Sequence, residues 1–436
     1  MVNVAKVFST LGNPDSLIPL AIKDSASTAG MTVGSYITGK EEGHDRFIDE
    51  VGTEAIWLGG LPFFKWIYNK TVFKSQGLDA KFDARNLKDK NILEKIKKYA
   101  PTDKIKENIE KISTNEIAYK RTATGRFLVS TVLTIGSYIG LTKYKQHYTD
   151  KKIRENLIKE YKESQAKKTK ENKDSNSQNP SFKGVGSTIE SIALSPVKNM
   201  WVLDGAITAE RLADSRSKQE FIGYAIKEAS LLFFMYYAGG KIQEMLENYA
   251  EKKHKMSIAL DARVLEDGFL KKAFEDGTIS KSLEDFKNAN TSKANLYEFL
   301  HKNPDNLVVK AAKMSDIIKM YEISQGIFKK SIITDKIDTR KFIDLEDFEN
   351  LNKKIETLYS QYKNALSSGN TSDDFFKQIK KLKRNSIITG LGSCMFALGV
   401  LTPAVMLLNR MASNDNQEFE TKKRIRKQLI KEGIIA

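Results

Sequence analysis

The sequence predicts a mainly α-helical integral membrane protein that is built from two divergent copies of one helical unit. Three observations predict it. Apolar residues recur every three or four positions through long charged runs, and an uncharged apolar stretch of 25 residues lies near the C-terminus. Short sequence matches also recur in the same order in both halves. Strict alternation of apolar and polar residues is rare, so we expect little β-sheet.

The composition indicates which cellular compartment and which kinds of partner suit the chain. A chain of 436 residues is long enough for more than one domain, and its formal charge of +16 suits a negatively charged partner, either anionic lipid or nucleic acid. The single cysteine, Cys394, excludes an intramolecular disulfide and a cysteine-cluster metal site. We therefore favour a reducing compartment. The first 25 residues lack a basic region followed by an apolar core, which argues against a cleaved secretory signal.

The stretch 385–409 is the best candidate for a transmembrane helix. It is uncharged, and basic residues flank it on both sides. A helix needs about 20 mostly apolar residues to cross the roughly 30 Å of hydrocarbon in a bilayer. Small residues such as Gly390 and Gly399 suit close packing of helices in lipid. A fully buried core helix is the alternative interpretation.

The shorter stretch 127–142 has 16 uncharged residues and is a second candidate span. Two aromatic segments, 55–68 and 221–240, contain internal charges, which favours the bilayer interface over its centre. Glu54 directly precedes the first of these segments and Glu228 lies in the second, and the matching pairs Glu54-Ala55 and Glu228-Ala229 make the two glutamates candidate equivalents in the two halves. A carboxylate within lipid would be a functional candidate, but we expect both to be solvated at the interface.

The two halves of the chain predict a duplication. "FDARNLKD" (82–89) and "LDARVLED" (260–267) are identical at five of eight positions. "IRENLIKE" (153–160) and "IRKQLIKE" (425–432) are identical at six of eight. We assign a first repeat to 1–161 and a second repeat to 185–436, with a flexible polar linker at 162–184. In the second repeat, an insertion at about 268–380 looks helical, suits a coiled hairpin and is a candidate for binding another protein.

The repeated Asp-Ala-Arg segments contain Asp83 with Arg85, and Asp261 with Arg263. Residues two apart on a helix do not face each other. We therefore expect each side chain to pair with a neighbouring segment or to cap a turn, which is a structural role.

Two basic amphipathic helices are predicted at 151–165 and 422–434. Each carries a narrow apolar stripe, and the remaining surface is dense in Lys and Arg, which is typical of a helix that lies on anionic lipid. Nucleic acid is not favoured as a partner, because no aromatic residues are interleaved with the charges. The candidate lipid contacts are Lys151, Lys152, Arg154, Lys422, Lys423, Arg424, Arg426 and Lys427.

No motif predicts catalysis, a cofactor, a metal or a nucleotide. "GSYITGK" (34–40) fits the first seven positions of a phosphate-binding loop, but Glu41 stands where Ser or Thr would hold Mg²⁺. The four histidines are isolated. We therefore expect a structural or scaffolding protein of the membrane, not an enzyme. A small transporter or channel formed by the two repeats is the alternative, and a soluble basic helical protein is the next.

Overall fold

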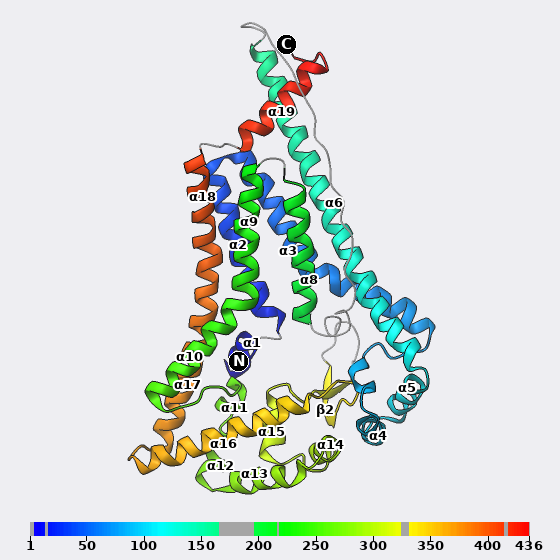
Figure 1. The fold of residues 1–436 in the computed structure, drawn as a ribbon, viewed down its shortest axis with the longest axis vertical. Helices are drawn as coiled ribbons and strands as arrows, with labels where there is room; N and C mark the ends of the chain where they lie inside the picture. The colour runs from blue at the N-terminus through cyan, green and yellow to red at the C-terminus, as the bar shows by residue number, and fades with distance from the viewer. Residues whose placement is uncertain are drawn as a thin grey trace. The chain divides into compact units, whose positions relative to one another are not determined.

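The computed structural model describes residues 4–13, 16–164, 196–215, 218–323, 331–413 and 417–435. The structure is mainly helical (Figure 1), which confirms that part of the prediction. The chain packs as two compact units whose segments alternate along the sequence. Unit 1 contains Met1–Pro19, Ile67–Arg126 and Gly240–Leu391, and unit 2 contains Leu20–Trp66, Phe127–Gly239 and Gly392–Ala436.

The units do not follow the boundaries predicted near residues 161 and 185. Each unit combines segments from both predicted repeats, so the predicted boundaries do not separate the two compact units. Residues 165–184 of the predicted linker lie outside the described part of the chain. The order of elements is similar in the two halves, because each has a helix pair that ends in a π-helix before its Asp-Ala-Arg segment. The duplication itself stays a prediction.

Unit 1 is a helical domain with one small hairpin. Its shorter elements begin mostly at polar residues whose side chains accept the first free backbone N–H groups, such as Asp89, Thr102 and Ser292. The helices are α1 (Val4–Gly12), η1 (Asn69–Phe73), η2 (Ala84–Leu87), α4 (Lys90–Lys98), α5 (Asp103–Thr114), α10 (Gly239–His254), α11 (Ala262–Glu266), α12 (Phe269–Glu275), α13 (Thr278–Ala289), α14 (Lys293–Lys302), α15 (Leu307–Met314), α16 (Leu345–Ser367) and most of α17 (Ser372–Phe396).

The insertion at 268–380 differs from its prediction. It is not a coiled hairpin, because its helices fold into the apolar core of unit 1. The insertion is also not helical throughout, since α15 ends at Met314 and strand β1 (Met320–Ile323) follows. Strand β1 pairs antiparallel with β2 (Ile332–Ile337), and Met320 lies opposite Ile337. The apolar spacing of a short β-branched run does not distinguish helix from strand, and tertiary packing decides it.

Unit 2 is a bundle of long helices. In Figure 1, α2, α8, α9 and α18 run in roughly the same direction, and α3 is tilted relative to them. Its elements are α2 (Leu17–Thr38), α3 (Lys40–Tyr68), the second part of α6 (Glu116–Ser164), α8 (Pro196–Ala213), α9 (Lys218–Leu232), η3 (Phe233–Ala238), η4 (Ala397–Leu401), α18 (Thr402–Ser413) and α19 (Gln417–Lys431). The segments η3 and η4 are π-helical turns inside otherwise continuous helices.

One crossing in the bundle depends on glycine. A Cβ atom on Gly30 of α2 would lie 2.0 Å from the backbone oxygen of Gly399 in η4, so these backbones are in direct contact. Gly34, one turn later, packs against Pro403. The expectation that small residues allow close packing therefore holds at Gly399. It is wrong at Gly390, where a Cβ would meet nothing within 4 Å.

Within the described ranges, one helix is long and apolar enough to cross a membrane. It runs through Ser372–Asn409, its most apolar stretch has a mean hydropathy of 2.0, and only 28% of that stretch is buried. It contains the predicted span 385–409. The other candidate, 127–142, lies inside α6 and does not pass the same test of length and composition.

Candidate functional site

A network of buried ion pairs lies inside unit 2, with Arg211 of α8 at its centre. The guanidinium pairs with Glu228 of α9 through Nη1, and its Nη2 lies 3.3 Å from the Asp49 carboxylate of α3. Its Nε donates a hydrogen bond of 2.7 Å to the Tyr138 hydroxyl of α6. These side chains are less than a tenth exposed. Four helices are therefore joined through one buried cation.

The network continues through two lysines and a second arginine. Lys227 Nζ lies 2.7 Å from Glu50 Oε2, and Lys145 Nζ lies 3.5 Å from Asp49 Oδ1. Arg46 lies 3.4 Å from Glu50 on the same helix. All five residues are buried. Each buried carboxylate of the network thus has at least two cations within ion-pairing distance, which a dry interior requires if the charges are to persist.

Helical spacing explains how one helix supplies three of these groups. Positions 46, 49 and 50 lie on one face of α3, because residues three and four apart are neighbours on a helix. Sequence reasoning missed this cluster, since "DRFIDE" resembles a solvated charged face. The available signal was the position of these charges directly before the apolar aromatic segment at 55–68.

The expectation that Glu54 and Glu228 are solvated is wrong for Glu228. Its side chain is 2% exposed and pairs with Arg211 and with Lys227. The physical reason is that α9 turns this charge into the bundle, where two cations from the network compensate it. Glu54 is half-buried and accepts a hydrogen bond from the Ser25 hydroxyl. The structure therefore does not bring the two repeat-equivalent glutamates into equivalent contacts.

Two further buried ionisable groups contact the π-helix η3. Lys23 of α2 donates from Nζ to the backbone oxygens of Phe234 at 3.3 Å and Met235 at 3.1 Å. Asp204 of α8 accepts a hydrogen bond from the Tyr236 hydroxyl. A π-turn leaves backbone oxygens without their usual helical partners, and here a buried ammonium takes that role.

Each Asp-Ala-Arg segment forms a compact turn. Asp83 and Asp261 cap η2 and α11 by accepting the backbone N–H two residues later. The arginine then folds back, so Arg85 Nη2 lies 2.8 Å from Asp83 and Arg263 Nε lies 3.4 Å from Asp261. Residues two apart do face each other here, because the aspartate has extended backbone before the helix. Arg263 also pairs with Asp316 at 2.7 Å.

The basic helices contact each other, which corrects part of their prediction. Ile153 near the end of α6 packs with Ile425 and Leu429 of α19, so the apolar stripes expected to face lipid are covered. Arg154 pairs with Glu432, and Arg424 pairs with Asp150. Lys152, Lys422, Lys423 and Lys427 also have partners. The charged rims remain on the surface, where Lys151 and Arg426 are exposed.

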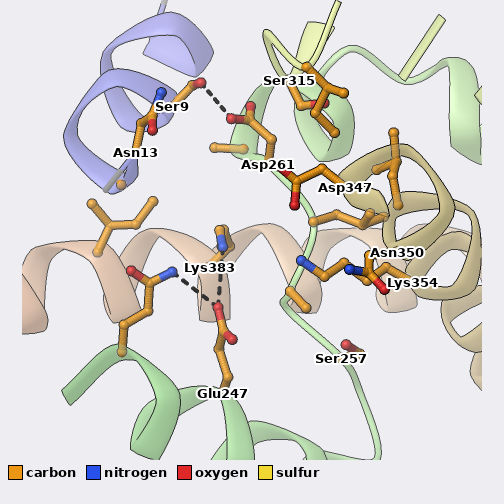
Figure 2. A pocket seen from close by; sticks show the side chains of 18 of the residues that line it. Ser9, Asn13, Glu247, Ser257, Asp261, Ser315, Asp347, Asn350, Lys354 and Lys383 are labelled. Carbon is orange, nitrogen blue, oxygen red and sulfur yellow. Dashed lines mark hydrogen bonds and ion pairs between the residues drawn. The ribbon is translucent and has the colours of Figure 1, made fainter. Parts of the chain in front are cut away.

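Unit 1 contains an open polar cavity of about 670 Å³ (Figure 2). Its walls come from α1, α10, α16, α17 and the segment before α11. Helix α16 presents Asp347, Asn350, Lys354 and Thr357 at helical spacing. The remaining polar lining comprises Ser9, Asn13, Gln243, Glu247, Glu251, Ser257, Asp261, Ser315, Lys353 and Lys383.

Internal contacts fix one side of this cavity. Ser9 donates a hydrogen bond of 2.7 Å to Asp261, which holds α1 against the start of α11. Lys383 donates to the backbone oxygen of Ile258 at 2.8 Å and lies 3.6 Å from Glu247. Asp347, Asn350 and Lys354 on the facing helix are exposed. The cavity therefore combines donors and acceptors of both charges, and its volume fits a small polar molecule or a short peptide segment.

A titratable cluster joins α4 and α14 in unit 1. The His301 ring stacks on Tyr99 with centroids 4.4 Å apart, and its Nε2 is buried without a hydrogen bond. Burial, helped by the nearby charge of Lys313, lowers the pKa of His301 to about 4. Beside it, hydrogen bonds from Lys302, Lys95 and Tyr99 lower the pKa of Glu298. The cluster favours neutral imidazole.

The remaining motif has no phosphate-binding geometry. Residues 34–40 cover the junction between α2 and α3, so a helix precedes the glycine where a phosphate-binding loop has a strand. Among the described residues, no group of three or more His, Cys, Asp or Glu side chains is placed to hold a metal ion. The chain matches no protein-family model, and no curated protein or solved structure is significantly similar to it.

Proposed function

We propose that unit 2 is a membrane-embedded helical bundle that anchors unit 1, and that the chain acts as a membrane scaffold. The observation that carries the proposal is the inverted polarity of the bundle. Most of the exposed large apolar side chains of the chain belong to unit 2. They include Val33, Ile37, Phe47, Leu58, Phe63, Trp66, Val129, Val132, Leu133, Trp201, Phe233, Tyr237, Phe396, Val400, Leu401, Val405, Leu408 and Met411.

The interior of the bundle encloses polar and charged groups beside apolar ones. Its buried residues include the ion-pair network and several hydroxyl side chains, such as Ser130 and Thr134 at 0% exposed. In water, apolar side chains leave the surface and charges remain there, because hydration favours that arrangement. In hydrocarbon both preferences reverse, and ionisable side chains face the bundle interior and pair with one another. The bundle therefore suits lipid as its solvent.

Unit 1 supplies the water-exposed half of the proposed scaffold. Its core is apolar, and its charged side chains lie mostly on the surface. The open polar cavity that α10 and α16 help to line is the site that we assign to a small polar molecule or a short peptide segment. The exposed cations on the α6 and α19 pair, such as Lys151 and Arg426, would add attraction to anionic headgroups, on the order of 1 kcal/mol each.

A matched pair of arginine substitutions tests the membrane assignment. Val400 is 51% exposed on the bundle, and Ile333 is 64% exposed in unit 1. If lipid surrounds the bundle, Val400→Arg costs about 2.5–3.5 kcal/mol at the centre of a span, and less protein withstands carbonate extraction of membranes. Ile333→Arg should leave extraction unchanged. Release of the wild-type chain by carbonate, or equal behaviour of the two variants, would contradict the proposal.

A proton- or ion-conducting role is the second candidate, and the buried network favours it. Ionisable side chains within spanning helices commonly line ion pathways. The full pairing of Arg211, Asp49 and Glu228 favours the scaffold, since paired groups hold a fixed structure. Liposomes reconstituted with the full chain separate the two roles. Ion or proton flux that is lost in Asp49→Asn would establish the pathway, and flux equal to that of empty liposomes supports the scaffold.

A further inference from the structure

Asp204 of α8 differs from the paired carboxylates of the buried network. Glu228 has two cations within ion-pairing distance, and Asp49 has three. Asp204 is 5% exposed, and the only hydrogen bond or ion pair of its carboxylate within the described ranges is the hydrogen bond from Tyr236. A carboxylate charge in that environment lacks the compensation that its neighbours have.

The charges around Asp204 do not supply this compensation at short range. From α2, Asp24 faces it with the same charge, and from α9 Glu228 does so as well. Arg211 of α8 is the cation that acts on it, but that guanidinium is already engaged by Glu228, Asp49 and Tyr138. Tyr236 of η3 supplies a neutral hydroxyl. Two like charges and one occupied cation make the ionised form costly.

We propose that the Asp204 carboxyl is a proton-binding site of unit 2 and that it holds its proton at neutral pH. The protonated group is neutral, so burial costs far less than for the carboxylate. One carboxyl oxygen accepts from the Tyr236 hydroxyl, and the other carries the proton. The partner hydroxyl of Asp204 belongs to η3, and Lys23 donates to backbone oxygens of the same π-helix, so release of the proton would place a negative charge close to this segment. The inference depends only on the burial of Asp204 inside unit 2, so it applies to the chain in detergent and in lipid.

Two isosteric substitutions test it on the full chain in detergent. Asparagine imitates a protonated aspartate, so Asp204→Asn should keep the wild-type melting temperature at neutral pH. Glu228→Gln removes the compensation of two buried cations and should lower the melting temperature by many degrees. In infrared spectra at neutral pH, the carbonyl band of protonated carboxyl groups should lose the contribution of one carboxyl in Asp204→Asn and keep it in Glu228→Gln.

A third variant keeps the test decisive if Asp204→Asn does not fold. Tyr236→Phe removes the hydrogen bond to the carboxyl and should shift the frequency of the same infrared band without abolishing it. The proposal is overturned if the wild type lacks the band, if Asp204→Asn leaves its intensity unchanged, or if Tyr236→Phe leaves its frequency unchanged. A loss of stability in Asp204→Asn equal to that in Glu228→Gln would also overturn it.

Discussion

The interiors of the two units differ in how much charge they enclose. In unit 1 the most buried side chains are apolar, and Ile96, Phe348 and Ile379 are fully enclosed. In unit 2 apolar side chains such as Leu203 and Leu398 are also enclosed, but Arg211, Lys227 and Glu228 are enclosed beside them, and many large apolar side chains are exposed. Both units are helical, so secondary structure does not distinguish them. The difference teaches that the placement of charge distinguishes the two units where helix content does not.

The largest expected effect is the loss of the central cation of the network. Arg211→Met leaves Asp49 and Glu228 buried without their main partner, and breaking a buried ion pair costs about 3–5 kcal/mol. Thermal unfolding in detergent should show a strongly lowered transition. The control is Arg85→Met in unit 1, where a part-exposed arginine pairs with Asp83 and less than about 1 kcal/mol is expected. Equal losses would remove the contrast between the interiors.

The next effect concerns the close helix crossing in unit 2. Gly30→Ala places a Cβ 2.0 Å from the Gly399 backbone oxygen, so the helices must separate. Overpacking of this kind costs about 1–3 kcal/mol. Gly392→Ala is the matched control, because its Cβ would meet nothing within 4 Å, and alanine is the better helix former. The melting temperature of Gly30→Ala should be well below that of Gly392→Ala. The reverse order would refute this crossing.

Acid should affect unit 1 through His301. The pKa of this imidazole is lowered from 6.5 to about 4 by burial, so the folded state binds its proton less readily than the unfolded chain. Its contribution is complete above about pH 6.5 and is lost as the pH falls toward 4, by roughly 2–3 kcal/mol. His301→Phe keeps the stacking on Tyr99 and should flatten this part of the pH profile. An unchanged acid dependence in that variant would place the titration elsewhere.

The smallest effect is expected on the surface of unit 2. The Arg154–Glu432 ion pair joins α6 to α19 but is about one third exposed. Exposed pairs contribute about 0.2–1 kcal/mol, and salt weakens them. A double-mutant cycle with alanine at both positions should give a coupling energy in that range that falls as salt rises. A coupling energy above about 2 kcal/mol would mean that this surface is enclosed, as the network is.

Local features of the sequence predicted part of the candidate site. The N-caps Asp83 and Asp261 and the apolar stripes at Ile153 and Ile425 are visible in short stretches. What these groups contact was not predictable. The apolar stripes were expected to face lipid, but they pack against each other. Burying both stripes in one contact removes their apolar surface from the solvent, and only the fold shows that they are close enough to do so. Figure 2 likewise gathers residues from four separate parts of the sequence into one cavity.

The sequence by itself determined the helical class, the caps of the shorter helices and the apolar stretch at 385–409. Each depends on interactions within one or two helical turns, or on composition alone. Only the tertiary structure decided that the charges of α3 are buried and that Asp204 is left with a hydroxyl. Lys227 and Glu50 are 177 positions apart, and Arg211 and Tyr138 are 73 apart. Charge pairing between residues so far apart in the sequence depends on which helix faces meet in the fold. The cost of burying a charge there depends on the packing and on the solvent, and not on the residues next to it in the sequence.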